Sequence, residues 1–220
     1  MTTDPPSAEA AQVRSTGRLR PDKHRAILAG GREVFAHSGF TRSSIDMIAT
    51  AAGVSTRTIY KHFPDKAALF AAVIADSAAR VAEGETTLIA EHLSDVAAVQ
   101  EVEPALLNLA TAWLESTAPT GDHRALMAQV HGEAAQLDPT VVTGWWHAGP
   151  GRVLDELAAT LQRWDDARLL SVPAPAIAAI HYSELVSATP GPPGTSLSVE
   201  DRATWVSAGV TAFVRAYRVS

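Results

Sequence analysis

A run of hydrogen-bonding side chains occupies positions 55 to 62 of the sequence. Hydroxyl, guanidinium, ammonium and imidazole groups of this kind donate hydrogen bonds to base edges, sugars and phosphates. An arginine in the first turn of a helix can form two hydrogen bonds to one guanine, which is worth roughly 1–3 kcal/mol of discrimination between bases. These residue types therefore predict a short helix whose outer face reads DNA. The members of the run are Ser55, Thr56, Arg57, Thr58, Tyr60, Lys61 and His62.

Two predicted helices must position this run. The first begins at Ser43 or Ser44, with Ser43 and Asp46 spaced as in a capping box, and the second is capped by Ser55. Gly53 supplies the positive φ that a tight turn between them requires. Two helices joined in this way predict a helix-turn-helix, and the alternative is a helical hairpin whose polar face is merely hydrated. The residues expected to bury the inner faces are Ile45, Ile48, Ala49, Ala52, Val54, Ile59 and Phe63.

Different parts of this motif are expected to contact different parts of DNA. Thr56 and Arg57 lie in the first turn, which reaches base edges, and the later residues of the short helix lie near sugar and phosphate. The free N–H groups at the start of the preceding and following helices can hold phosphates. The predicted DNA-binding residues are therefore Ser43, Ser44, Ser55, Thr56, Arg57, Tyr60, Lys61, His62 and Lys66.

The distribution of charge supports this prediction, although the net charge of the chain is −6. Residues 14–66 carry ten Lys/Arg against four Asp/Glu, whereas residues 67–220 carry eight Lys/Arg against eighteen Asp/Glu. A basic first third on an acidic remainder is expected when one module faces a polyanion, and the alternative is chance clustering on a hydrated face. Arg14, Arg18 and Arg20 in the predicted flexible arm are expected to add minor-groove or phosphate contacts.

The segment GFTRSSIDMIATAAGVSTRTIYKHFPDKAALF resembles the DNA-binding segment of TetR-family transcriptional regulators, over about residues 21–70. This resemblance implies a homodimeric repressor that binds a near-palindromic double-stranded operator, with a larger helical domain that binds a small effector. A looser similarity to one subgroup of the family's C-terminal domains lies in GWWHAGPGRVLDELAATL. The matching positions are Gly39-Phe40, Ser43-Ser44, Ile48-Ala49, Ala52 to Ser55, Thr58 to Tyr60, Phe63, and Lys66 to Leu69.

Helical periodicity continues through the rest of the chain, and no stretch alternates with the period of a strand. We therefore predict an all-α fold with three parts: a flexible arm at 1–20, a helix-turn-helix domain at 21–66, and a helical ligand-binding and dimerisation domain at 67–220. Gly39 is expected to end the first helix, and a long helix is expected after Pro64-Asp65. Its apolar stripe is Leu69, Phe70, Val73, Ile74, Ser77 and Val81.

Aromatic and polar residues gather in the middle of the predicted second domain. An apolar cavity with a few polar groups suits a small amphipathic effector, and the alternative is that these aromatic residues belong to the core. The predicted pocket residues are Trp113, Met127, His131, Trp145, Trp146, His181 and Tyr182. The last two helices are expected to form a dimer interface through Ile177, Ile180, Leu185, Trp205, Phe213 and Tyr217, with packing inside one protomer as the alternative.

Other function classes find little support in the sequence. The chain has no cysteine, which excludes disulfides, thiol nucleophiles and thiolate metal sites. His181 and Glu184 share a helical spacing, but such pairs are usually structural, so we predict no metal and no cofactor. No nucleophile elbow or phosphate-binding loop is present, and we predict no enzymatic activity. No signal peptide or membrane span is evident, which predicts a cytoplasmic protein. The competing function is a ligand-binding or scaffold protein whose helix-turn-helix no longer reads DNA.

Overall fold

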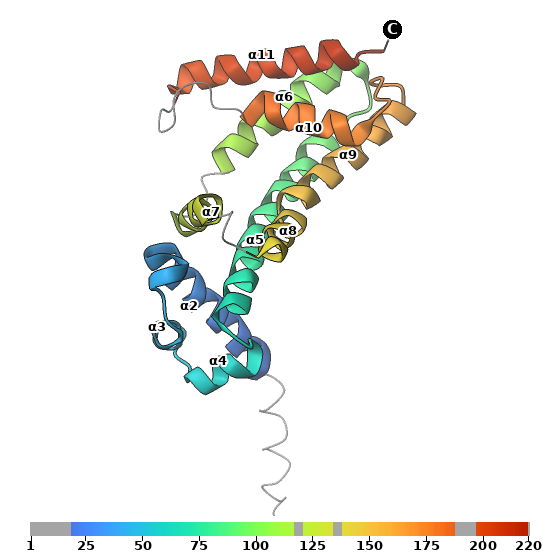
Figure 1. The fold of residues 1–220 in the computed structure, drawn as a ribbon. Helices are drawn as coiled ribbons and strands as arrows, with labels where there is room; N and C mark the ends of the chain where they lie inside the picture. Colours follow the sequence, from blue (N-terminus) through green and yellow to red (C-terminus); the bar gives the residue numbers. More distant parts are fainter. Residues whose placement is uncertain (1–18, 117–120, 134–137, 188–196, 220) are drawn as a thin grey trace, which may run out of the picture. The chain divides into compact units, whose positions relative to one another are not determined.

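The computed structural model describes residues 19–116, 121–133, 138–187 and 197–219, and within these ranges the fold is all-α, as predicted (Figure 1). None of the described helices combines the length and the apolar character that crossing a membrane would require. The elements are α2 (Leu19–Arg42), α3 (Ile45–Ala51), α4 (Thr56–His62), α5 (Lys66–Leu93), α6 (Val99–Ser116), α7 (Gly121–Glu133), α8 (Pro139–Ala148), α9 (Pro150–Asp166), α10 (Pro175–Ser187) and α11 (Val199–Tyr217).

The chain folds into two compact units. The first comprises residues 1–77 and 121–142, and the second comprises residues 78–120 and 143–220. The division falls inside the long helix α5, and the first unit also takes in α7. The sequence predicts a boundary at residue 66 between a DNA-binding domain and a ligand-binding domain. That functional boundary stays a prediction. The predicted arm at 1–20 lies almost entirely outside the described residues.

In the first unit, α2 packs against α3 and α7, and α3 packs against α4. The core is built from the apolar faces that helical spacing predicted, including a T-shaped contact between Phe35 and Phe70 with ring centroids 5.0 Å apart. On the α5 stripe, Leu69, Phe70, Val73, Ile74 and Ser77 are buried and Val81 is half-buried, which confirms the predicted periodicity.

Gly39 interrupts helix α2, as predicted: its backbone is non-helical, with a φ of 72°, and a short helical stretch continues beyond this kink to Arg42. The start of the next helix is one of the two positions that the sequence predicted. The capping box at Ser43 is wrong, because Ser44 is the N-cap of α3 and its Oγ accepts a hydrogen bond from the Met47 N–H at 3.2 Å. Ser43 itself is buried, in the link between α2 and α3.

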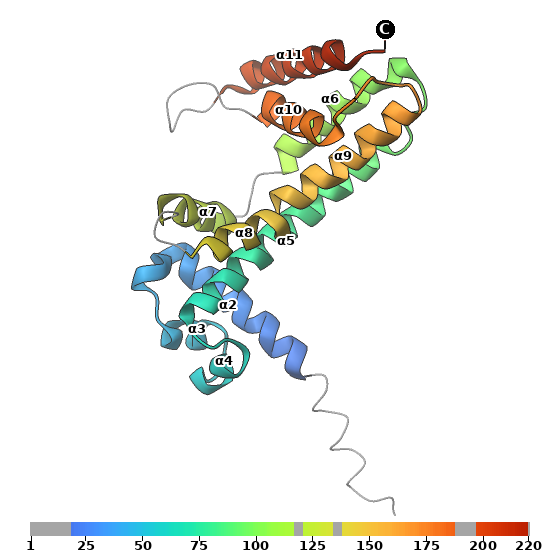
Figure 2. The same cartoon turned by 45° about the vertical axis from the view of Figure 1, so that its right-hand side comes forward.

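The second unit is a layered bundle in which α10 packs against α9 and α11, and α11 packs against α6 (Figure 2). Its core gathers large apolar side chains from all of these helices around Tyr182. The helical pattern of the segment GWWHAGPGRVLDELAATL is interrupted at Gly149, since α8 ends at Ala148 and α9 begins at Pro150. Pro150 fits the first turn of a helix because that position needs no N–H donor.

Candidate nucleic-acid interface and effector site

The turn between α3 and α4 is held by backbone hydrogen bonds and by a serine cap at the start of α4. Gly53 has a φ of 62°, a left-handed conformation that favours glycine. The Val54 N–H donates to the Ala49 carbonyl at 3.0 Å across the turn. Ser55 then caps α4, because its Oγ accepts a hydrogen bond from the Thr58 N–H at 3.2 Å. Helix α4 thus has a fixed starting point and direction within the first unit.

Helix α4 divides cleanly into an inner and an outer face. Ile59 is fully buried, whereas the neighbouring Tyr60 is 56% exposed. Arg57 and Lys61 are also exposed, and Thr56 is half-buried at the start of the helix. Among the predicted DNA-binding residues, Arg57, Tyr60 and Lys61 thus combine on one solvated surface. This arrangement presents a guanidinium, a phenol and an ammonium without any rearrangement of the core.

His62 occupies a different environment at the end of α4. Its ring makes a T-shaped contact with His24 of α2, with centroids 5.6 Å apart, and lies 6.4 Å from the ring of Phe63. The side chain is therefore half-buried at the junction of α2 and α4. Its predicted role in DNA binding stays a prediction, while its observed contacts are within the unit.

Ser43 and Lys66 are used inside the first unit. The Ser43 Oγ donates to the Phe40 carbonyl at 2.8 Å, and Ser43 is only 5% exposed. The Lys66 Nζ donates to the carbonyls of Phe40 and Ser43, both at 2.9 Å, and lies 4.5 Å from the centroid of the Phe40 ring. These contacts tie the end of α2 to the start of α5. The surface we propose below for base reading therefore omits both residues.

A second polar contact joins α5 to α7 in this unit. The buried Ser77 hydroxyl and the Nδ1 of His123 are 2.9 Å apart. Because burial disfavours the charged imidazolium, it lowers the pKa of His123. Arg32 of α2 and Asp76 of α5 add an ion pair at 3.5 Å. Sequence reasoning included Ser77 in an apolar stripe and did not find its partner, which lies 46 residues away in the chain.

The seven predicted pocket residues are divided between the two units. Met127 and His131 lie on α7 in the first unit, and the other five lie in the second. Trp145 and Trp146 contact each other, with centroids 6.4 Å apart, and Trp146 is 44% exposed. His181 is exposed, and its Nδ1 is 2.7 Å from the Tyr217 hydroxyl. The prediction that these residues line one cavity stays a prediction.

Tyr182 belongs to the core of the second unit. Its hydroxyl donates to the Leu106 carbonyl at 2.7 Å, and the side chain is fully buried. Burial raises the pKa of Tyr182 far above its ordinary value, so this phenol stays neutral. Its ring stacks on Trp113 with centroids 6.3 Å apart and planes 23° apart. Tyr182 therefore supports Trp113 from behind and presents no polar group to a ligand.

Sequence reasoning missed Glu85, which lies on α5 beside Trp113. Glu85 is half-buried and accepts a hydrogen bond from the Trp113 side chain. Burial raises the pKa of Glu85, and the hydrogen bond from Trp113 partly offsets that effect. The available signal was a single acid between Val81 and Leu88 on one helical face. The partner on α6 became visible only in the folded chain.

A groove of about 590 Å³ lies between α6 and α11 in the second unit. Its volume falls in the range of small-molecule sites, yet it contains none of the seven predicted pocket residues. Apolar side chains dominate its walls, with one acid and one base at its edge. The lining residues are Leu107, Thr111, Leu114, Glu115, Leu197, Val199, Arg202, Ala203, Val206 and Ser207.

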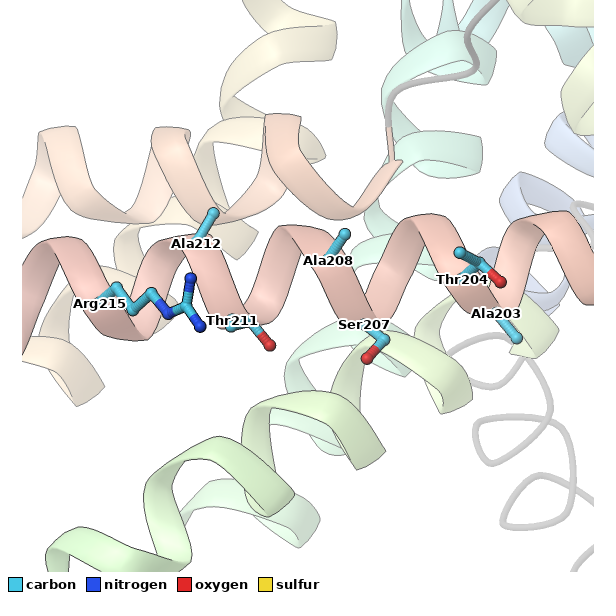
Figure 3. A pocket seen from close by; sticks show the side chains of 7 residues that line it. All are labelled: Ala203, Thr204, Ser207, Ala208, Thr211, Ala212 and Arg215. Atoms are coloured by element: carbon cyan, nitrogen blue, oxygen red, sulfur yellow. The ribbon is translucent and has the colours of Figure 1, made fainter.

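The predicted interface residues separate into outer and inner positions. Ile177, Ile180 and Trp205 are 53%, 45% and 36% exposed. Leu185 and Tyr217 are half-buried. Phe213 is fully buried in the core, because it packs against Tyr182 and Tyr217, so the interface proposed below omits it. Figure 3 shows a second hollow, which lies along α11. The labelled side chains that line it are mostly small, from Ala203 to Ala212.

Comparison with known families covers both parts of the chain. Residues 27–73 match the family described as bacterial regulatory proteins, tetR family. Residues 104–219, more than half of the chain, match the C-terminal domain of AefR-like transcriptional repressors. The first match contains α3 and α4, and the second contains α10 and α11.

Curated relatives match over a short segment. The HTH-type transcriptional repressor AcnR of Corynebacterium efficiens is 36% identical over 69 residues, which is 31% of this chain and 37% of that protein. AcnR of Corynebacterium glutamicum is 37% identical over the same length, again 37% of that protein. The matched segment thus spans little more than a third of either relative.

Solved structures share the fold over nearly the whole chain. A putative TetR-family regulator from Mesorhizobium loti superposes with a TM-score of 0.77 at 23% identity, covering 90% of this chain and 98% of that one. The flavonoid-responsive regulator FrrA superposes with a TM-score of 0.66 at 26% identity, covering 92% and 98%. Together with the two family matches, which include more than half of the sequence, these similarities show that the chain belongs to the TetR family of transcriptional regulators.

Proposed function

We propose that this protein is a ligand-responsive transcriptional repressor that binds a near-palindromic operator as a homodimer. The observation that carries the proposal is the outer face of α4, where Arg57, Tyr60 and Lys61 project from a helix fixed by buried Ile59 and by the Ser55 cap. Repression, rather than activation, is supported by the similarity to the AcnR repressors over 69 residues. Such a protein would act in the cytoplasm, where bacterial DNA lies.

In this proposal, α4 enters the major groove and Arg57 bonds a guanine. Tyr60 and Lys61 contact sugar and phosphate, and the N–H groups at the start of α3, beside Ser44, bind a phosphate of the same strand. A homodimer would place two α4 helices about 34–36 Å apart or a multiple of that distance, so that both enter grooves on one side of the duplex. The operator would then be an inverted repeat.

Release from DNA would require coupling between an effector and α4. Helix α5 contributes residues to both units, so a shift of this one continuous helix would be felt at Lys66 and at Glu85. Couplings of this kind are typically about 1–3 kcal/mol, and nearly complete release demands more. The similarity to FrrA, whose name describes a response to flavonoids, supports a small-molecule effector without naming one for this chain.

The test is selection of bound sequences from random duplex DNA at a stated salt concentration, with wild type, Arg57→Ala and Arg57→Lys in parallel. Wild type should recover an inverted repeat. Arg57→Ala should lose preference at one base pair of each half-site, by roughly 5- to 150-fold, because it cannot bond guanine, and Arg57→Lys should lose less, because a flexible ammonium lacks the rigid guanidinium fork. The lysine variant keeps the charge and so controls for phosphate attraction. Recovery of unordered sequences by folded wild type would reject the proposal in favour of a protein that no longer reads DNA.

A further inference from the structure

The groove between α6 and α11 has walls that are held in place. At one end, the Thr211 hydroxyl on α11 donates to the Glu103 carboxylate on α6 at 2.8 Å, which joins the two helices. The start of α11 is fixed by Ser198, whose Oγ accepts a hydrogen bond from the Asp201 N–H at 3.1 Å. The groove is lined by later residues of α6 and earlier residues of α11. A site whose walls are fixed before binding loses little entropy when a ligand arrives.

Apolar side chains make up most of the interior of this groove. Val206 is 3% exposed and belongs to the core of the unit, whereas Leu107 and Leu114 on α6 are half-buried. Val199, at the start of α11, is 89% exposed. The Thr111 hydroxyl donates to the Leu107 carbonyl at 2.9 Å, so it is already used within α6. An apolar body lying in the groove would cover these side chains and remove their surface from water.

Two opposite charges line the same groove from its two walls. Glu115 lies on α6, Arg202 lies on α11, and both side chains are exposed. They do not pair with each other, because both ion pairs found in the described ranges of the chain lie in the first unit. The groove therefore offers a carboxylate and a guanidinium to one ligand, beside an apolar interior.

This arrangement of charges favours a ligand that carries both charges itself. A ligand carboxylate matches the planar guanidinium of Arg202, which can hold it with two parallel hydrogen bonds. A ligand ammonium group matches the carboxylate of Glu115. A ligand with one charge would satisfy one wall and meet a like charge on the other. A neutral ligand would use only the apolar interior.

The size and position of the groove favour a small molecule over a second copy of the chain. Its volume of about 590 Å³ is typical of small-molecule sites. None of the residues proposed for the dimer interface lines it. On α11, Trp205 points about 100° away from its neighbour Val206, which does line the groove. Figure 3 shows Ala203 and Ser207, two more lining residues, on the side of α11 turned toward α6.

We propose that the groove between α6 and α11 is the effector site, and that the effector is a zwitterion with an apolar body. Its amino group would meet Glu115, its carboxylate would meet Arg202, and its apolar part would cover Leu107, Leu114 and Val206. This inference rests on the proposed function, because it names the effector of the same regulator. It differs from the sequence prediction, since the groove contains none of the seven residues predicted to line a pocket.

The direct test is calorimetric titration of the full-length protein with three probes that share a phenyl group and differ in charge: L-phenylalanine, phenethylamine and hydrocinnamate. At pH 7 the first carries both charges, the second only the ammonium group and the third only the carboxylate. L-Phenylalanine should bind more tightly than either other probe by about fivefold or more, because each of them lacks one ion pair and meets a like charge.

Two neutral variants assign the two charges. Arg202→Gln should remove the advantage of L-phenylalanine over phenethylamine, and Glu115→Gln should remove its advantage over hydrocinnamate. Arg215→Gln and Glu91→Gln are the matched controls, because both residues are exposed in the second unit and neither lines the groove. All four variants should unfold at the temperature of wild type, since the substituted side chains are exposed. Ala203→Phe should weaken binding of all three probes, because its ring would occupy the groove.

Equal binding of the three probes, absence of L-phenylalanine binding at millimolar concentration, or unchanged selectivity in both glutamine variants would each overturn the inference. Probe binding that weakens as the protein associates would overturn it too, and would assign the groove to a second copy. Operator binding, measured on the same samples without a probe, keeps the inference distinct from the proposed function. Intact operator binding with equal probes would reject the zwitterion site alone. Failure of folded wild type to bind any operator would reject the regulator, whatever the probes show.

Discussion

At the scale of single residues, the direction in which a side chain points, more than its chemical type, determines which groups it contacts. Lys66 and Lys61 are five positions apart, and sequence reasoning assigned both to DNA contact. Lys61 is exposed on α4, but the Lys66 ammonium donates to the carbonyls of Phe40 and Ser43. The same chemical group is therefore open to solvent in one case and bonded at the α2–α5 junction in the other.

This difference predicts opposite phenotypes for two matched substitutions. Lys66→Met should lower the free energy of unfolding by about 1–3 kcal/mol, because two bonds to a charged donor are lost. Lys61→Met should change it by less than about 0.5 kcal/mol, and should reduce the slope of log affinity against log salt by about one. Urea unfolding and operator binding at several salt concentrations measure both quantities. A stable Lys66→Met with a flattened slope would return that residue to the DNA interface.

At the scale of elements, the helix-turn-helix depends on a close crossing of α2 and α3. A Cβ added at Gly30 would lie 2.7 Å from the backbone nitrogen of Ala52. No flexible side chain can move aside there, because the obstacle is the backbone at the start of the turn. Glycine at this position thus lets α2 support the helix that precedes α4.

Replacement of glycine by alanine should therefore have opposite effects in two helices. Gly30→Ala should lower the free energy of unfolding by about 1–3 kcal/mol, since the helices must separate. Gly84→Ala in α5 should raise it by about 0.5–1 kcal/mol, since nothing lies within 4 Å of the added Cβ and alanine favours a helix. Chemical denaturation of both variants decides the matter, and equal effects would argue against the close crossing.

At the scale of the whole molecule, the proposed regulator needs an exposed apolar surface that a second copy can cover. Ile177 and Ile180 project from α10, and Trp205 projects from α11. Isolated exposed apolar residues are normal, but three on two helices that pack against each other are candidates for a self-complementary contact. A twofold axis would bring each residue into the interface twice.

Ile180→Glu should accordingly convert the proposed dimer into a species of 23.2 kDa, because the contact would bury carboxylates without partners. Operator affinity should fall with it, since each α4 would then bind a half-site alone. Val99→Glu is the control, as Val99 is similarly exposed but lies on α6. Sedimentation equilibrium at micromolar concentration distinguishes the two states. A wild type that sediments as a monomer would remove the dimer from the proposal.

The sequence by itself determined the local features of this protein. Ser55 as a cap, Gly53 in the turn, Ile59 buried beside exposed Tyr60, and the break before Pro150 all follow from interactions within a few residues, where periodicity and capping are informative. The resemblance to the TetR family rested on the same local positions. The error within this reach was the capping box at Ser43, since the cap of α3 is the next residue, Ser44.

Only the tertiary structure decided which polar groups meet across helices. The bond from Tyr182 to Leu106 joins residues 76 positions apart, and the contact of Glu85 with Trp113 joins α5 to α6. Helix periodicity gives the face on which a residue lies but not the crossing that brings another helix to that face. For that reason Phe213 and Tyr182 belong to the core, and the ammonium of Lys66 is bound inside the first unit.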